Sequence, residues 1–195
     1  MIYKFKEFTP FIDPSAFVHP MACVTGCVRI GKDVYIGPFA VLRGDFGEII
    51  IEDGCNIQEH CMVHMFPGIT THLMKNVHVG HGAIIHGAVI EENCLIGMNS
   101  VVMDDVVIGR NSIVGAMSFV KEATRIEEKS LVVGNPAKVV KQVSEDMINW
   151  KTKGTELYQQ LARDCHNELR EVEPLRMIPE NWPIPNQNYS SWKRQ

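Results

Sequence analysis

The sequence lacks any run of about 20 apolar residues, the length that a membrane-spanning helix needs. Its first segment, Met1 to Phe8, also lacks the apolar stretch and the cleavage site of a secretory signal. A basic excess is missing too, since 23 Asp and Glu residues stand against 19 Lys and Arg residues and the formal net charge is −4. This balance gives no electrostatic reason to expect nucleic acid or an anionic membrane as a partner. We therefore expect a cytoplasmic protein that binds neither nucleic acid nor membrane.

Cys-x-x-Cys pairs are also absent, which removes the commonest thiolate spacings of zinc sites. Cytosolic thiols are normally kept reduced, so a chain without an export signal is expected to carry free cysteines. We therefore interpret all six cysteines as free thiols, namely Cys23, Cys27, Cys55, Cys61, Cys94 and Cys165.

A six-residue period of aliphatic residues governs most of the chain. In three successive runs, every sixth position carries Ile, Val or Leu, and the residue two positions earlier is usually small. An amphipathic helix would need a period near 3.6, and an ordinary half-buried strand a period of 2 over a short run, so neither explains the pattern. The three runs are Ile12, Val18, Val24, Ile30, Ile36 and Leu42; Ile51, Ile57 and Val63; and Ile84, Ile90, Ile96, Val102, Ile108, Val114, Val120 and Ile126.

A six-residue unit has room for one short strand and one tight corner, where Gly and small polar residues are favoured. Three units close a triangular coil whose inward aliphatic residues stack on those of the next coil. The sequence therefore predicts an all-β solenoid, a parallel β-helix, over residues 1–140. Gly44 to Glu48 shifts the phase of the period, and residues 65–77 contain Pro67-Gly68 and no repeat, which predicts a protruding loop.

Beyond the solenoid, apolar residues recur at helical spacing and predict a helical appendage over residues 144–173. Ser144 followed by Glu145 and Asp146 is typical of a helix start. Gly154-Thr155 is typical of a break and a second start, so we expect more than one C-terminal α-helix. Four prolines between Pro174 and Pro185 predict a non-helical, extended tail over residues 174–195.

Five of the eight histidines lie between His64 and His86. His64 follows the aliphatic stop Val63, and His86 occupies the equivalent place on the next coil if Ile85 is a stop. A strict third run makes Ile84 the stop instead, and the period alone leaves both registers open. In the first register, the two imidazoles lie about one strand spacing, 4.7–4.9 Å, apart and are close enough to share an ion.

His81 is separated from His86 by a corner of the triangle, so it does not easily join the other two imidazoles within one chain. A neighbouring subunit could supply it. This arrangement predicts a homotrimer with three metal sites, each taking two histidines from one chain and one from the next.

The spacing of four segments adds a resemblance. Arg43-Gly-Asp45, Asn56-Ile-Gln58-Glu59, His64 and His81-x4-His86, set on a hexapeptide repeat, resemble the gamma-class carbonic anhydrase family, and more closely its branch of phenylacetate-degradation and carnitine-operon proteins. The resemblance implies a left-handed β-helix. It also implies that His64, His81 and His86 bind zinc or another divalent metal, such as iron or cobalt.

The same resemblance implies four catalytic-site residues. Arg43 and Asp45 match residues that pair across the subunit boundary. Gln58 matches the residue that hydrogen-bonds the metal-bound water or the substrate. Glu59 stands where the family usually has aspartate.

Three imidazoles leave one position of a tetrahedral ion open, as in catalytic zinc sites, and an ionised water there can attack a carbonyl carbon. The branch implies a coenzyme A thioesterase of phenylacetate, aromatic-acid or carnitine metabolism, with an acyl-coenzyme A as substrate. A carbonic anhydrase acting on carbon dioxide or bicarbonate is the alternative, although Phe46 and the segment from Met65 to Gly68 offer no carboxylate to shuttle protons. A hexapeptide-repeat acyltransferase, for which the segment from Gly134 to Lys138 is typical, and a non-catalytic trimeric scaffold also stay open.

Overall fold

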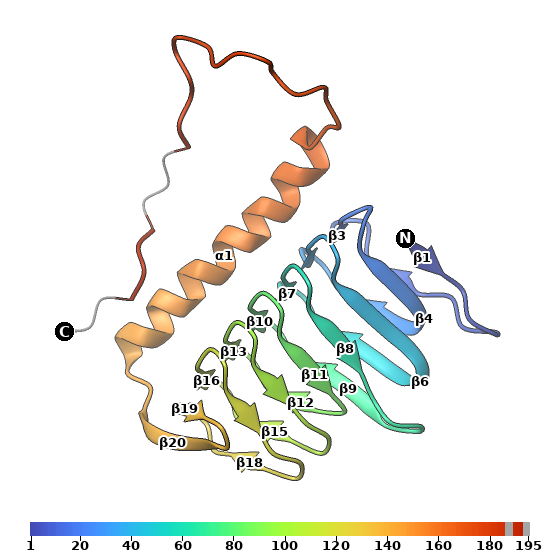
Figure 1. The fold of residues 1–195 in the computed structure, drawn as a ribbon. Helices are drawn as coiled ribbons and strands as arrows, with labels where there is room; N and C mark the ends of the chain where they lie inside the picture. The colour runs from blue at the N-terminus through green and yellow to red at the C-terminus, as the bar shows by residue number, and fades with distance from the viewer. Residues whose placement is uncertain (186–188, 193–195) are drawn as a thin grey trace.

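The computed structural model describes residues 1–185 and 189–192 and is a parallel β-solenoid followed by one long helix (Figure 1). Most coils contain three short strands joined by corners, and the strands of successive coils pair in parallel. This architecture confirms the hexapeptide-repeat β-solenoid that the six-residue period predicts.

The strands lie on three faces. The helix face contains β3 (Phe17–Val18), β5 (Tyr35–Ile36), β7 (Asn56–Ile57), β10 (His78–Val79), β13 (Leu95–Ile96), β16 (Ile113–Val114), β19 (Ser130–Gly134) and β20 (Ala137–Gln142). The histidine face contains β1 (Ile2–Tyr3), β8 (Met62–His64), β11 (Ile84–His86), β14 (Val101–Val102) and β17 (Phe119–Val120). The third face contains β2 (Phe11–Ile12), β9 (Thr70–Leu73), β12 (Val89–Ile90), β15 (Val107–Ile108) and β18 (Arg125–Ile126). Two longer strands, β4 (Cys23–Ile30) and β6 (Val41–Ile51), run round the corner from the histidine face to the third face.

Columns of inward-facing aliphatic residues form the core. On the histidine face, Leu42 pairs with Val63 and Val63 with Ile85, and all three are fully buried. Ile84 is 40% exposed on the outside of the same strand, so it is not the stop that a strict third run predicts. The six-residue period cannot distinguish two adjacent isoleucines, whereas strand pairing shows which of them faces the core. Gly87, with φ of +58°, allows the tight five-residue step from Ile85 to Ile90.

The segment over residues 65–77 differs from the expected protruding loop. Its second half forms β9, which pairs with β6 (Ile51 with Leu73) and with β12. Met65, Thr71, Leu73 and Val77 are fully buried. The insertion is therefore confined to the turn between β8 and β9. A six-residue pattern missed the strand because Leu73 follows Val63 by ten positions rather than six.

The C-terminal end of the solenoid is closed by β20, which runs antiparallel to β19. A single helix, α1 (Glu145–Glu168), follows, with Ser144 as its N-cap accepting a hydrogen bond from the backbone N–H of Met147 at 3.3 Å. The expected break at Gly154-Thr155 is absent. The helix continues through both residues, and both are buried. The described residues after Glu168 form no helix or strand, so the helix ends before residue 173.

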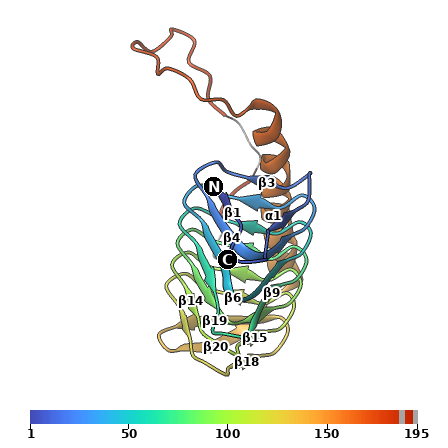
Figure 2. The ribbon, with the colours of Figure 1, turned by 90° about the vertical axis from the view of Figure 1, so that its right-hand side faces the viewer.

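Helix α1 packs along the helix face, and Figures 1 and 2 place it along one side of the stack of coils. Two apolar clusters hold it there. Phe17 and Tyr35 pack against Ala162 near one end, and Ile113 packs against Val143 and Met147 near the other. Within the described ranges, no helix is both long and apolar enough to cross a membrane. All six cysteines are free.

Candidate functional site

The histidine face brings His64 and His86 together on neighbouring strands. β8 and β11 pair so that the two residues are direct partners, which is the first of the two registers that the period allows. His64 Nδ1 lies 3.2 Å from His86 Nε2. His64 is 7% exposed, and His86 is half-buried. Parallel pairing of β8 with β11, one coil later, therefore brings the two imidazoles close together. The turn after β8 lengthens this coil, so the two histidines are 22 residues apart.

A carboxylate contacts the far nitrogen of each ring. His64 Nε2 lies 3.0 Å from Asp45 Oδ1, and His86 Nδ1 lies 2.7 Å from Asp104 Oδ1. A neutral imidazole that donates a hydrogen bond through one nitrogen keeps a lone pair on the other. The two carboxylates therefore direct the lone pairs of His64 Nδ1 and His86 Nε2 toward each other. Two facing lone pairs are stabilised by an electropositive group between or beside them, such as a metal ion, a shared proton or the guanidinium of Arg43, whose Nη2 lies 3.3 Å from His64 Nδ1.

The geometry of this pair fits one metal ion. Two nitrogens bound to a tetrahedral zinc at about 2.0–2.1 Å lie about 3.3–3.4 Å apart, close to the observed separation of 3.2 Å. Metal-binding histidines usually donate their other N–H to a carboxylate or carbonyl, as both rings do here. Among the described residues of a single chain, however, no group of three His, Cys, Asp or Glu side chains is placed to hold a metal. A single chain thus offers two candidate ligands at this position, His64 and His86.

Arg43 and Asp45 belong to the same cluster. Arg43 Nη1 donates to Asp45 Oδ2 at 2.7 Å, and Nη2 lies 3.3 Å from His64 Nδ1. Partial burial works to raise the pKa of Asp45, but hydrogen bonds from Arg43 and His64 outweigh it and hold that pKa below its usual value. Within one chain these two residues pair with each other, so the expected pairing across a subunit boundary stays a prediction.

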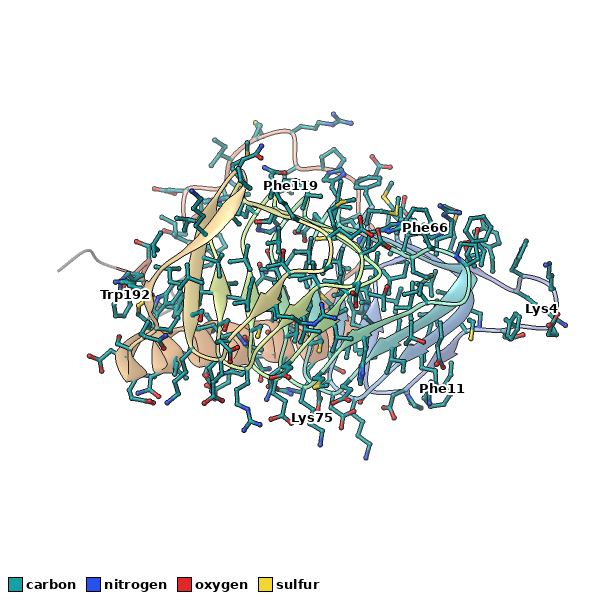
Figure 3. The ribbon with its side chains drawn as sticks, turned by 90° about the horizontal axis from the view of Figure 1, so that it is seen from below. Lys4, Phe11, Phe66, Lys75, Phe119 and Trp192 are labelled. Carbon is teal, nitrogen blue, oxygen red and sulfur yellow. The ribbon has the colours of Figure 1, made fainter. Side chains whose placement is uncertain are left out.

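Two phenylalanines flank the imidazole pair. The ring of Phe46 lies 5.5 Å from that of His64, and the ring of Phe66 lies 5.1 Å from that of His86. Both rings are more than half exposed. Figure 3 shows Phe66 on the same side of the molecule as Phe119, which lies further along the histidine face. These positions carry no carboxylate that could pass protons to or from the site.

Gln58, Glu59 and His81 lie around a different corner, between the helix face and the histidine face. His81 Nδ1 lies 2.5 Å from Glu59 Oε2, and Tyr35 Oη donates to Glu59 Oε1 at 3.1 Å. The imidazole of His81 is about half exposed. A ring that donates through Nδ1 keeps its lone pair on Nε2, so His81 can act as a ligand or a base toward a group outside the chain.

Gln58 is almost fully buried and has both amide hydrogens engaged. Its Nε2 donates to Asn56 Oδ1 at 3.0 Å and to His78 Nε2 at 2.7 Å. Burial, together with Lys151 and His81, lowers the pKa of His78 to about 3, so this imidazole is neutral and accepts the hydrogen bond from Gln58. Among the described residues, Gln58 Oε1 accepts no hydrogen bond and is available to a ligand.

Three residues of these clusters are not among those that the sequence patterns indicate. Asp104 follows His86 by 18 residues, one full coil, and that spacing could have revealed it. His78 pairs in register with Asn56, but no chemical pattern singles it out. Tyr35 lies on β5 beneath Glu59, and no signal in the sequence pointed to it.

An apolar column also runs along the outside of the histidine face. Strands that face water usually alternate apolar inside with polar outside. Here the outward position immediately before each inward aliphatic residue, from β4 to β17, is apolar instead, with Ile84 the most exposed of them. The residues are Cys23, Val41, Met62, Ile84, Val101 and Phe119.

Comparisons with known proteins agree with this fold. A family model described as bacterial transferase hexapeptide (six repeats) matches residues 87–122. The chain is 49% identical over 181 residues to the carnitine operon protein CaiE of Escherichia coli K12, an alignment covering 93% of this chain and 92% of the relative. It is also similar to the structure of a candidate acetyltransferase of Bacillus cereus (TM-score 0.82, 33% identity, 83% of this chain and 94% of that one). A hexapeptide transferase family protein of Anaplasma phagocytophilum gives a TM-score of 0.80, with 33% identity over 83% of this chain and 96% of that one.

Proposed function

The chain belongs to the hexapeptide-repeat transferase family that includes the carnitine operon protein CaiE, and we propose that it is a metal-dependent hydrolase of acyl-coenzyme A thioesters. Its site would lie between two subunits of a homotrimer, with His64 and His86 from one chain and His81 from the next. The observation that carries the proposal is the pair of facing nitrogens, His64 Nδ1 and His86 Nε2, with Asp45 and Asp104 on the far side of the rings.

The trimer is supported by the apolar column on the histidine face. A continuous apolar surface that solvent reaches marks a protein interface more often than a free surface, and in this column Ile84 is exposed and the other five residues are partly exposed. The column lies on the same face as His64 and His86, so a second copy that covered it would also approach the imidazole pair. His81 is half exposed at the corner beside this face, where it can reach a neighbouring subunit. The occupant we propose is therefore a second copy of this chain.

A divalent ion bound to three imidazoles, zinc, iron or cobalt, would supply a water that ionises near neutral pH. The chain's own contribution is to orient that water and the thioester. Because both amide hydrogens of Gln58 are engaged by Asn56 and His78, Gln58 faces the site with its carbonyl oxygen. It is therefore suited to accept a hydrogen bond from the attacking water, rather than to donate one to a developing oxyanion.

Hydrolysis of a thioester forms a C–O bond with water and breaks the C–S bond, releasing a carboxylic acid and the coenzyme A thiol. Each of the two reactions releases one proton per turnover near neutral pH, but hydrolysis at an ordinary enzymatic rate demands much slower proton transfer to bulk solvent than rapid hydration of carbon dioxide does. The site offers exposed Phe46 and Phe66, with no shuttling carboxylate at either position, which favours a thioester over carbon dioxide.

A second candidate is an acyltransferase in which His81 acts as a general base. Its support is the short contact between His81 and Glu59, which orients the ring, and the similarity to a candidate acetyltransferase. General bases are typically histidines oriented by a carboxylate. This reaction would move the acyl group from coenzyme A to an amine or hydroxyl and needs no metal.

The test is hydrolysis of a panel of acyl-coenzyme A thioesters by metal-loaded protein, before and after treatment with a chelator. We expect turnover that is lost on chelation and restored by zinc, iron or cobalt. His81→Ala should lose both turnover and bound metal, whereas His60→Ala, an exposed corner histidine stacked on Phe39, should keep both. Acyl transfer that survives chelation would establish the second candidate. Fast hydration of carbon dioxide in a stopped-flow assay without thioester turnover would establish a carbonic anhydrase.

A further inference from the structure

A large cavity lies between α1 and the solenoid. Its volume is about 610 Å³, within the range of about 300–1,000 Å³ that small-molecule sites span. It follows the corners after β10, β13 and β16 on one side and the buried side of α1 on the other. Its walls are mostly apolar and include Leu95, Met98, Ile113, Trp150, Leu157 and Leu161.

The cavity reaches the candidate site. Gln58 and His81 both line it, together with the neutral His78. Gln58 is fixed by its two hydrogen bonds and presents a free carbonyl oxygen. The other polar wall residues include Lys151, whose amine donates to Asn76 O and Asn93 Oδ1, and Tyr189, whose hydroxyl donates to Trp150 O. An apolar cavity with a few converging polar groups at one end suits a ligand with an apolar body and one polar, reactive group.

We propose that this cavity binds the acyl group of the substrate, with the thioester carbonyl beside Gln58 and His81 and the apolar part of the acyl group beneath α1. The inference rests on the proposed function and narrows its substrate class to apolar acyl groups of medium size, such as an eight-carbon chain or a single ring. A molecule of water occupies about 30 Å³ of liquid, so the cavity has room for roughly twenty heavy atoms. An acetyl group would leave most of it filled with water, whereas an octanoyl or phenylacetyl group, with about nine heavy atoms, would occupy about half of it.

Helix α1 is therefore part of the substrate site and not only a support for the solenoid. Leu157, which is partly buried, and Leu161, which is 37% exposed, line the cavity from the helix, and Tyr189 of the tail closes over Gly154 at the same cavity. The solenoid supplies the reacting end through Gln58 and His81, and α1 sets the size of the acyl group.

Binding can be measured without turnover. The probe is S-octyl-N-acetylcysteamine, a thioether that cannot be hydrolysed, titrated calorimetrically into full-length protein stripped of metal with a chelator. Leu157→Trp, which fills the cavity from the helix, should weaken binding at least tenfold. Glu156→Trp, its exposed neighbour on the same helix, should bind as wild type does. Met98→Trp fills the cavity from an exposed corner and repeats the test if Leu157→Trp unfolds at a lower temperature.

Turnover then distinguishes this inference from the proposed function. With metal-loaded protein, kcat/KM should rise from acetyl- to octanoyl-coenzyme A by about fourfold for each buried methylene, and should be high for phenylacetyl-coenzyme A. Leu157→Trp should flatten this series. Probe binding that depends on Leu157 but is accompanied by no thioester turnover would support the cavity and reject the hydrolase. Absence of binding, or equal binding by wild type and both cavity variants, would overturn the inference.

Discussion

Asp104→Asn should weaken metal binding while leaving the fold unchanged. Asp104 is 7% exposed, and its Oδ1 contacts His86 Nδ1 at 2.7 Å, so the carboxylate fixes the ring and makes the opposite nitrogen more basic. Asparagine keeps the shape and an acceptor oxygen but removes the charge, and charge-assisted hydrogen bonds are roughly twice as strong as neutral ones. Loss of such a partner typically lowers metal affinity about 10–100-fold, equivalent to about 1.4–2.7 kcal/mol.

The assay is competition for zinc between the purified protein and a chromophoric chelator of known affinity. Asp105→Asn is the matched control, because Asp105 is exposed and contacts Arg125 rather than a histidine. It should change the free energy of unfolding by no more than about 1 kcal/mol and leave zinc affinity unchanged. Equal zinc affinity in Asp104→Asn and Asp105→Asn would refute the role assigned to the carboxylate behind His86.

Three further perturbations test the fold, the assembly and the buried amine. Ile51→Ala should lower the free energy of unfolding by about 2–5 kcal/mol in chemical denaturation. Ile50→Ala, on the outside of the same strand, should lower it much less, and similar losses in the two variants would contradict the register. Ile84→Asp should convert a trimer to monomers by light scattering, and Ile50→Asp, on the third face, should not; an intact Ile84→Asp trimer would exclude the histidine face as the interface. Burial lowers the pKa of Lys151 from 10.5 to about 7, so the unfolded chain binds more protons than the folded one between these values. The free energy of unfolding should therefore rise with pH across that window, by at most about 1.4 kcal/mol per pH unit relative to Lys151→Met, and a parallel pH dependence of the two proteins would contradict it.

Much of the fold could be predicted because the six-residue period leaves a strong local signal. Residues such as Ile57 and Ile96 are fully buried in the columns where the period places them. The expected strand positions were wrong where a second aliphatic residue stood beside the core residue, or where the distance between successive core residues was not six. Ile84 and Ile85 are chemically alike, and the ten-residue step from Val63 to Leu73 hid β9.

The candidate site was predicted in part. Seven residues came from motifs and a family resemblance, and the structure places them in two groups around two corners of one chain. His64, His86, Arg43 and Asp45 form the first group, and Gln58, Glu59 and His81 the second. Their meeting across a subunit boundary is a prediction that requires the trimer.

The sequence alone determined the solenoid, because each inward position must be aliphatic to stack on the coils above and below, and this requirement recurs every six residues. The tertiary structure alone decided which side chains meet. The closeness of His64 and His86, the pairing of Asp104 with His86, and the burial of His78 beneath α1 all depend on the length of individual corners and on the docking of a helix distant in sequence. Such contacts join residues that no local pattern connects, so they follow from packing and not from periodicity.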